Sequence, residues 1–318
     1  MKKHPAALIP HALFVLTVIY MVQYVINDGG NDLYIYRLGA ETITDGPGGP
    51  GLYEVSLDNY PFTYPPFAAL LFVPFALMPK EVGMALMMLI TAGIAWWLGW
   101  VITKYVSRRG VRIPLYEHLG TGCASTLALL IWASGPWRLT THFGQINAVI
   151  LLLVLADFLR PATRIPRGVL IGIAGGIKLT PLAFGLILLM RKDWRGIFTL
   201  GASFAATVII GFIFLPHEAF TFWTSAVSDP SRVGNINFLD NISIQGWLMH
   251  LGLRDPLLKP AYYGLVLATI VLFAALLHQL NRRKLVLSQV AVGGFLMVSI
   301  SPISWSHHNV MFPLILMA

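Results

Sequence analysis

The residue types that could move a proton at a membrane surface begin in segment 27–37. There Asp32 follows a long apolar run and precedes the sequence Leu-Tyr-Ile-Tyr-Arg, which includes Tyr36 and Arg37. A partly buried carboxylate in this position is held towards a bound hydroxyl and could act as a general base. Alternatively, Asp32 caps a helix whose tyrosines lie at the level of the lipid headgroups. From this segment alone both interpretations stay open.

A second polar segment covers residues 136–147. Arg138 could bind a phosphate there, and His142 could share a proton or hydrogen-bond to a sugar hydroxyl. Gln145 and Asn147 would contact the same substrate. The alternative is structural: Arg138 anchors the chain at the interface, and the two amides join neighbouring helices.

Segment 304–309 contains the adjacent His307 and His308. A histidine pair can bind a metal, but no Asp or Glu lies at the helical spacing of a dedicated zinc site. We therefore expect no metal, with one histidine facing a site and the other packing. Which of the two faces the site stays open.

Lys178 lies within an apolar stretch, where an ammonium costs about 2.5–3.5 kcal/mol even on lenient scales. It could bind a lipid phosphate, pair with backbone carbonyls of a broken helix, or extend to the cytoplasmic surface. Arg138, Arg232 and Lys178 are the cations that could stabilise a leaving phosphate. Five further candidates for substrate binding are Tyr36, Arg37, Tyr64, Asn241 and Ser243.

The composition indicates an integral membrane protein. Hydrophobic residues make up 56% of the 318 residues and charged residues only 11%, and the mean hydropathy is +0.71. A soluble domain of this length is therefore excluded. The formal charge of +8 comes from clusters at the ends of apolar runs, which is typical of membrane topology and not of polynucleotide binding. The single cysteine excludes a disulfide within the chain.

The apolar runs predict an all-α polytopic bundle, which we treat as one transmembrane domain over residues 1–318. The predicted spans are 6–26, 82–103, 119–136, 144–160, 196–215, 258–278 and 285–303. This threading places most of the 22 Lys and Arg residues on the cytoplasmic side. Asp32, His142, Asn241 and the histidine pair come out together on the other side.

Two further segments are not simple spans. Residues 67–78 are too short to cross and are predicted to lie at the outer interface. Residues 168–190 have basic residues at both ends and a glycine-rich first half, which indicates two half-helices that enter the membrane and return. If this segment crossed once instead, every later span would invert.

Several short motifs occur in a characteristic order. They are Asp-Leu-Tyr-Ile-Tyr at 32–36, Leu-Tyr at 52–53, Tyr-Pro-Pro-Phe at 64–67, Gly-Gln-Ile-Asn at 144–147, Lys-Leu-Thr-Pro at 178–181, Asn-Ile-Ser at 241–243 and Ser-Pro-Ile-Ser-Trp-Ser-His-His at 301–308. With this order and spacing the chain resembles glycosyltransferase family 87, which consists of membrane enzymes of the GT-C type. The resemblance runs from about residue 28 to the C-terminus.

The resemblance implies an inverting transfer of a sugar, with mannose expected, from a polyprenyl-phosphate donor to a lipid or glycan acceptor. The reaction would occur on the extracytoplasmic face of the plasma membrane, without a cofactor and without nucleic acid. By position the catalytic base is Asp32, with His142 and His308 as supporting site residues. Members of the family are usually longer, and the last apolar run is about half a span, so we expect the sequence to be truncated at its C-terminus.

Two other classes of protein remain as alternatives. A secondary transporter would also contain broken helices and a buried lysine, although repeat symmetry would be expected between its halves. A non-catalytic membrane scaffold would tolerate replacement of Asp32 by Asn.

Overall fold

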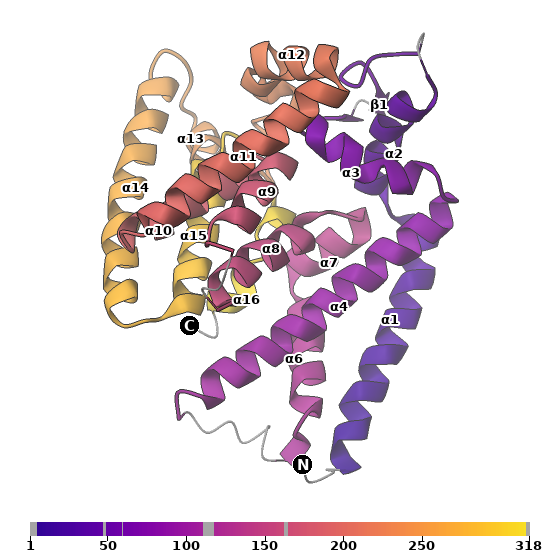
Figure 1. Ribbon diagram of the computed structural model, residues 1–318, viewed down its shortest axis with the longest axis vertical. Helices are drawn as coiled ribbons and strands as arrows, with labels where there is room; N and C mark the ends of the chain where they lie inside the picture. Colours follow the sequence, from indigo (N-terminus) through magenta and orange to yellow (C-terminus); the bar gives the residue numbers. More distant parts are fainter. Residues whose placement is uncertain (1–4, 47–48, 59, 111–117, 162–164, 316–318) are drawn as a thin grey trace.

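The computed structural model describes residues 5–46, 49–58, 60–110, 118–161 and 165–315, and it is helical almost throughout. Within these residues the only sheet is a small antiparallel hairpin of β1 (Ser56–Leu57) and β2 (Tyr60–Pro61). The prediction of an all-α multi-pass membrane protein is confirmed (Figure 1).

Among the residues that the structure describes, four helices are long and apolar enough to cross a membrane. They are α1 (Leu8–Asp28), α4 (Lys80–Ser107), α11 (Trp194–Phe214) and α14 (Leu258–Arg282). They coincide with four of the predicted spans. About half of the residues in the apolar part of α4 are buried, whereas α1, α11 and α14 are mostly exposed. Because their exposed residues are apolar, these three helices would face lipid.

The other three predicted spans form shorter helices. They are α6 (Gly122–Ala133), α8 (Asn147–Leu159) and α15 (Val286–Ile300), with 12, 13 and 15 residues. The chain breaks after α6 because Pro136 starts a new helix, α7 (Gly135–Phe143). Gly144, with a φ of 68°, then ends α7. α7 and α8 meet at a bend of 118°.

Several short helices gather at the end of the molecule opposite the N-terminus (Figure 1). They are α2 (Asn31–Thr44), α3 (Pro66–Ala76), α12 (Pro216–Thr224) and α13 (Ile244–His250), with the 3₁₀ turns η3 (Ala226–Ser228) and η4 (Pro230–Val233). A further 3₁₀ turn, η1 (Pro5–Ala7), precedes α1. α3 has 11 residues, in agreement with the predicted short segment that does not cross.

The segment 168–190 forms a helical hairpin, as predicted. It consists of α9 (Val169–Ile177), the 3₁₀ turn η2 (Thr180–Phe184) and α10 (Gly185–Met190). Gly168 packs against Gly196 near the start of α11, and Gly176 packs against Thr207 further along it. α10 ends at Met190, four residues before α11 begins. Both ends of the segment therefore lie near the start of α11, and the chain between them turns back on itself. Lys178 therefore lies at the tip of the hairpin.

A buried carboxylate fixes the start of this hairpin. Asp157 of α8 accepts hydrogen bonds from the backbone N–H groups of Gly168, Leu170 and Ile171, at 2.8–3.1 Å. These N–H groups have no partner within the first turn of α9, so the carboxylate satisfies them. Arg160 pairs with the same side chain at 2.8 Å and offsets its charge.

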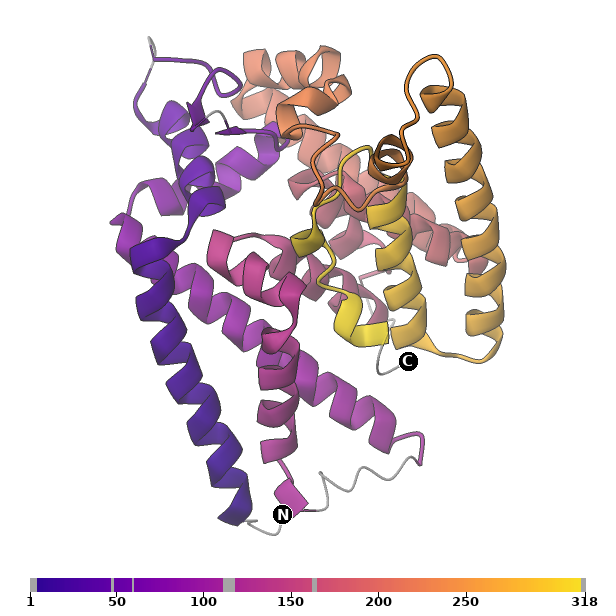
Figure 2. The ribbon, with the colours of Figure 1, turned by 180° about the vertical axis from the view of Figure 1, so that it is seen from behind.

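The chain after α15 returns to the middle of the bundle. It forms the 3₁₀ turn η5 (Ser306–His308) and the short helix α16 (Phe312–Ile315). Figure 2 shows this yellow segment passing beside the magenta α7. Trp137 of α7 donates a hydrogen bond to the carbonyl of Val310, at 3.0 Å, and joins the two segments.

Candidate active site

The position of Asp32 is set by the two glycines that follow α1. Gly30 has a φ of 96°, and its N–H donates to the carbonyl of His142 at 2.8 Å. A Cβ on Gly29 would collide with the same carbonyl oxygen, so the close approach requires glycine. As a result, the first turn of α2, which carries Asp32, lies beside the end of α7.

Gln145 joins the polar side chains around Asp32. Its Oε1 accepts hydrogen bonds from the hydroxyls of Tyr36, at 3.1 Å, and Tyr64, at 3.4 Å. The amide NH₂ must therefore point the other way. On that side Gln145 hydrogen-bonds to the Asp32 carboxylate, and its Nε2 lies 3.4 Å from Nε2 of His307.

The environment of Asp32 favours its neutral form. Burial raises the pKa of its carboxyl to about 6, while the Gln145 hydrogen bond and the charge of Lys178 act in the opposite direction. The carboxyl therefore changes its charge close to neutral pH, where a general base is most effective. Gly30 is the N-cap residue of α2, and no side chain caps this helix. The capping interpretation of Asp32 is therefore wrong.

Lys178 enters the same site from the tip of the hairpin. Its Nζ donates to Oδ1 of Asn147 at 3.4 Å and lies 5.6 Å from the centre of the Tyr64 ring. Its positive charge lowers the pKa of Asp32 and of the two histidines. The described structure thus brings an acid and a cation together from distant parts of the sequence.

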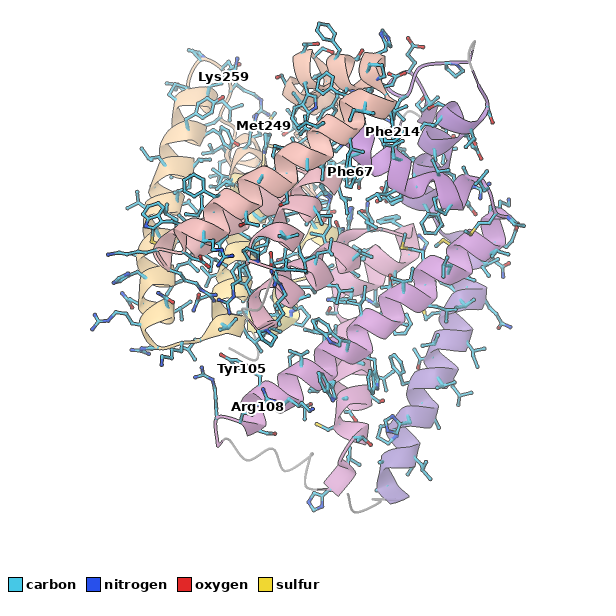
Figure 3. The ribbon with its side chains drawn as sticks, viewed as in Figure 1. Phe67, Tyr105, Arg108, Phe214, Met249 and Lys259 are labelled. Carbon is cyan, nitrogen blue, oxygen red and sulfur yellow. The ribbon has the colours of Figure 1, made fainter. Side chains whose placement is uncertain are left out.

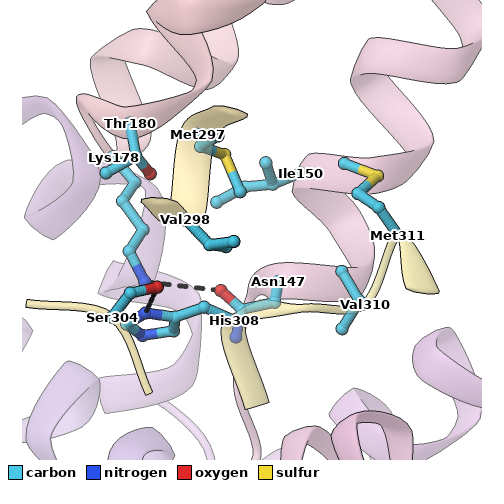
Figure 4. Close-up of a pocket in the computed structure, with 10 residues that line it drawn as sticks. All are labelled: Asn147, Ile150, Lys178, Thr180, Met297, Val298, Ser304, His308, Val310 and Met311. Atoms are coloured by element: carbon cyan, nitrogen blue, oxygen red, sulfur yellow. Dashed lines mark hydrogen bonds between the residues drawn. The ribbon is translucent and has the colours of Figure 1, made fainter. Parts of the chain in front are cut away.

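A narrow pocket lies beside the Lys178 ammonium. Polar groups from three segments line it: Asn147, Lys178, Thr180, Ser304 and His308. Figure 4 shows the Lys178 side chain extending towards Ser304 and His308. Apolar side chains, among them Ile150 and Met297, close the rest of the pocket. A pocket with a cation, an amide and a hydroxyl fits an anionic oxygen group such as a phosphate.

The two histidines differ in their roles. Nδ1 of His308 accepts a hydrogen bond from the backbone N–H of Trp305, at 3.2 Å, so the neutral ring carries its proton on Nε2. His307 packs edge-on against Phe143 and approaches Gln145. Burial, together with the Lys178 charge, lowers the pKa of His307 to about 3 and that of His308 well below its usual value. Both rings are therefore neutral near pH 7.

Asn241 and Ser243 hold the histidine segment in place. Oδ1 of Asn241 accepts from the N–H of Ser304 at 3.0 Å, and the Ser243 hydroxyl donates to the carbonyl of Pro302 at 2.9 Å. Ser243 also caps α13. These two predicted site residues thus contact the segment that carries His307 and His308.

Four predicted residues direct their side chains elsewhere. Arg37 donates to the carbonyls of Phe75 and Met78 at the end of α3. Arg232 donates to the carbonyl of Tyr53, at 2.7 Å. Arg138 is exposed on α7. The ring of His142 packs against Tyr24 and Phe143, so this residue reaches the site through its backbone carbonyl.

Two residues of the candidate site, Thr140 and Ser304, were not among the predicted site residues. Thr140 donates from its hydroxyl to the carbonyl of His307 at 2.8 Å, and this carbonyl also accepts from Asn147 at 3.1 Å. Ser304 lines the pocket. Both belong to polar segments that the sequence analysis singled out, but a hydroxyl bound to a distant carbonyl leaves no spacing pattern. In the described residues, no group of three or more His, Cys, Asp or Glu side chains is arranged to hold a metal ion.

The fold and this site define a membrane-embedded helical protein with acid, cation and neutral histidine side chains in one polar centre. The model of glycosyltransferase family 87 matches residues 62–302. The chain belongs to this family, so the resemblance noted in the sequence is confirmed.

Two relatives illustrate the match. The polyprenol-phosphate-mannose-dependent alpha-(1-2)-phosphatidylinositol mannoside mannosyltransferase of Mycobacterium tuberculosis (strain ATCC 25618 / H37Rv) is 33% identical over 301 residues, which cover 90% of this chain and 69% of that protein. The corresponding pentamannoside mannosyltransferase of Mycolicibacterium smegmatis (strain ATCC 700084 / mc(2)155) is 33% identical over 302 residues, which cover 90% of this chain and 68% of the relative. The chain thus spans about two thirds of the length of these relatives. No solved structure gives a significant match.

Proposed function

We propose that the protein transfers mannose from a polyprenyl-phosphate donor to a lipid or glycan acceptor, with inversion at the sugar C1. The observation that carries the proposal is the meeting of Asp32, Gln145 and Lys178 in one site of a family 87 chain. The names of the relatives support a polyprenyl-phosphate donor, mannose as the sugar and a phosphatidylinositol mannoside as the acceptor. Family membership favours this function over a secondary transporter, although the broken helix at Lys178 is also a transporter feature.

In the proposed reaction, Asp32 takes the proton of the acceptor hydroxyl while that oxygen forms a bond to C1 of the sugar. The bond between C1 and the phosphate oxygen breaks on the opposite face, and its electron pair leaves with the polyprenyl phosphate. The Lys178 ammonium lies where it can stabilise this growing negative charge. Nε2–H of His308 is a second donor towards the same pocket.

We place this site at the extracytoplasmic face of the plasma membrane. The support is the distribution of charge: the short loops on the other side of the predicted spans carry most of the Lys and Arg residues. A further support is the hairpin at 168–190, whose two ends lie near the start of α11. A hairpin of this kind does not add a crossing, so the later spans keep the directions on which the extracytoplasmic placement depends.

The identity of the donor is tested by giving membranes that contain the protein one of two donors in which the mannose is radiolabelled. We expect label to pass to a lipid fraction from polyprenyl-phosphate mannose, and not from a nucleotide-linked mannose when synthesis of the lipid-linked donor is blocked. Equal transfer from the nucleotide sugar under that block would contradict the proposal. Counterflow of free mannose without transfer would instead support a transporter.

A further inference from the structure

A second narrow pocket lies outside the polar site, between α3 and α11. We call it the α3–α11 groove; its walls are Pro65, Pro66, Phe67, Gly176, Thr207, Val208, Gly211 and Trp223. Figure 3 shows Phe67, near the start of α3, close to Phe214 at the end of α11. The walls are almost entirely apolar, and the one hydroxyl, on Thr207, donates to the carbonyl of Phe204 on its own helix. The groove therefore offers few hydrogen-bonding groups to a sugar and suits a hydrocarbon chain.

The groove adjoins the cation of the site through two short pieces of chain. Gly176 lies two residues before Lys178. Pro65 directly follows Tyr64, whose ring lies 5.6 Å from the Lys178 ammonium. Each piece thus has one end in the groove and the other beside the ammonium.

Glycine gives the groove its width on the side of α11. A Cβ added to Gly211 would lie 3.5 Å from Cβ of Pro66, so α3 and α11 leave room for one small group there. On the neighbouring turn of α11, Ile209 and Phe212 are exposed apolar side chains, 57% and 41% accessible. In a bilayer these side chains would contact lipid, and a hydrocarbon chain could enter the groove from the lipid phase.

We infer that the α3–α11 groove binds the polyprenyl chain of the donor. This inference rests on the proposed function and locates one part of its substrate. In the donor, the hydrocarbon chain is joined directly to the phosphate, so it must begin beside the cation that binds the phosphate. An acceptor lipid presents a sugar hydroxyl to Asp32, and its own acyl chains are separated from that hydroxyl by the sugar and headgroup. The groove beside Lys178 therefore fits the donor chain and not the acceptor chain.

The test fills the groove and compares two donors. Gly211→Leu places a side chain between α3 and α11, and Gly201→Leu on the same helix is the matched control, because a Cβ there meets nothing within 4 Å. Transfer is measured with a long-chain polyprenyl-phosphate mannose and with a short-chain analogue that ends before the groove. For Gly211→Leu we expect KM for the long-chain donor to rise roughly tenfold, as when about two methylene groups lose their apolar contacts. KM for the short-chain donor should stay unchanged, as should both values for Gly201→Leu.

A second pair of variants guards against a folding defect in Gly211→Leu. Val208→Trp enlarges a half-buried wall residue of the groove, and Ile209→Trp enlarges its exposed neighbour. The inference is overturned if the members of each pair have the same KM for the long-chain donor, or if KM rises for the acceptor lipid instead. If the wild-type protein transfers no sugar from either donor, the proposed function itself fails.

Discussion

The carboxylate of Asp32 and the ammonium of Lys178 interact electrostatically, although one belongs to the first turn of α2 and the other to the tip of the α9–α10 hairpin. Gln145 hydrogen-bonds to Asp32, and Asn147 accepts from Lys178 at 3.4 Å. The turn between α7 and α8 therefore positions both charges. In the proposed reaction the two side chains act on opposite ends of the bond change, at the acceptor hydroxyl and at the leaving phosphate.

The first prediction concerns pH. The proposed base must be ionised, and burial raises the pKa of Asp32 to about 6. We therefore expect kcat/KM to be low below that pH and to rise through a midpoint near 6 towards a plateau. Initial rates of mannose transfer between pH 4.5 and 8.5 measure this. A profile that is flat between pH 5 and 7 would contradict the assignment.

Replacement of Gln145 by Leu should move that profile. The Gln145 hydrogen bond lowers the pKa of Asp32, so its removal should raise the midpoint above that of the wild-type protein. Activity at pH 6.5 should fall while the plateau at high pH is partly kept. A uniform loss at every pH would show that Gln145 acts only on structure or substrate binding.

Replacement of Lys178 by Met should lower kcat by roughly 10²–10³, the usual effect of removing one group that stabilises transition-state charge. Lys178→Arg keeps the positive charge and should retain more activity. Since the Lys178 charge also lowers the pKa of Asp32, the remaining activity of Lys178→Met should show a higher midpoint. Equal rates for the Met and Arg variants would show that the positive charge at position 178 has no role in the reaction.

As pH rises, ionisation of Asp32 should lower the stability of the folded protein, whereas it should raise the activity. The carboxyl has a pKa of about 6 in the folded protein, above its ordinary value of 3.8, so the folded state binds this proton more tightly than the unfolded state does. Its contribution to stability is therefore lost as pH rises from about 4 to about 6, and is fully lost above that range. We expect Asp32→Asn to have an equal or higher Tm than the wild-type protein at pH 7.5. A clearly lower Tm in detergent or nanodiscs would contradict this.

The orientation in the membrane is tested with single cysteines in a Cys123→Ala background. Asn237→Cys lies in an exposed loop between α12 and α13, and Arg283→Cys follows α14. An impermeant thiol reagent should label position 237 in intact cells, and position 283 only after permeabilisation. The reverse pattern would place the site on the cytoplasmic side.

Much of the fold could be predicted because it follows from apolar length and charge. Four long spans and the hairpin at 168–190 were predicted in this way. The shorter α6, α8 and α15 fall within three further predicted spans. The separate helix α7 was not predicted, because apolar composition alone does not reveal that Pro136 begins a helix and Gly144 ends it. Where a break falls depends on packing across the bundle.

The candidate site was predictable in its residue types and less so in side-chain direction. Asp32, Gln145 and Lys178 meet because polar groups in an apolar bundle need partners. His142 was expected to contribute its ring, but the close approach of Gly29 and Gly30 uses its carbonyl. Arg37 binds carbonyls at the end of α3, a choice of acceptor that only the folded chain determines.

The most direct test of the account is mannose transfer from polyprenyl-phosphate mannose by the wild-type protein and by Asp32→Asn, both shown to be folded by thermal unfolding. Loss of general base catalysis predicts a fall in kcat of about 10²–10⁴ at pH 7.5, with the KM for the donor little changed. Equal kcat values for the two proteins would contradict the assignment of Asp32 as the base.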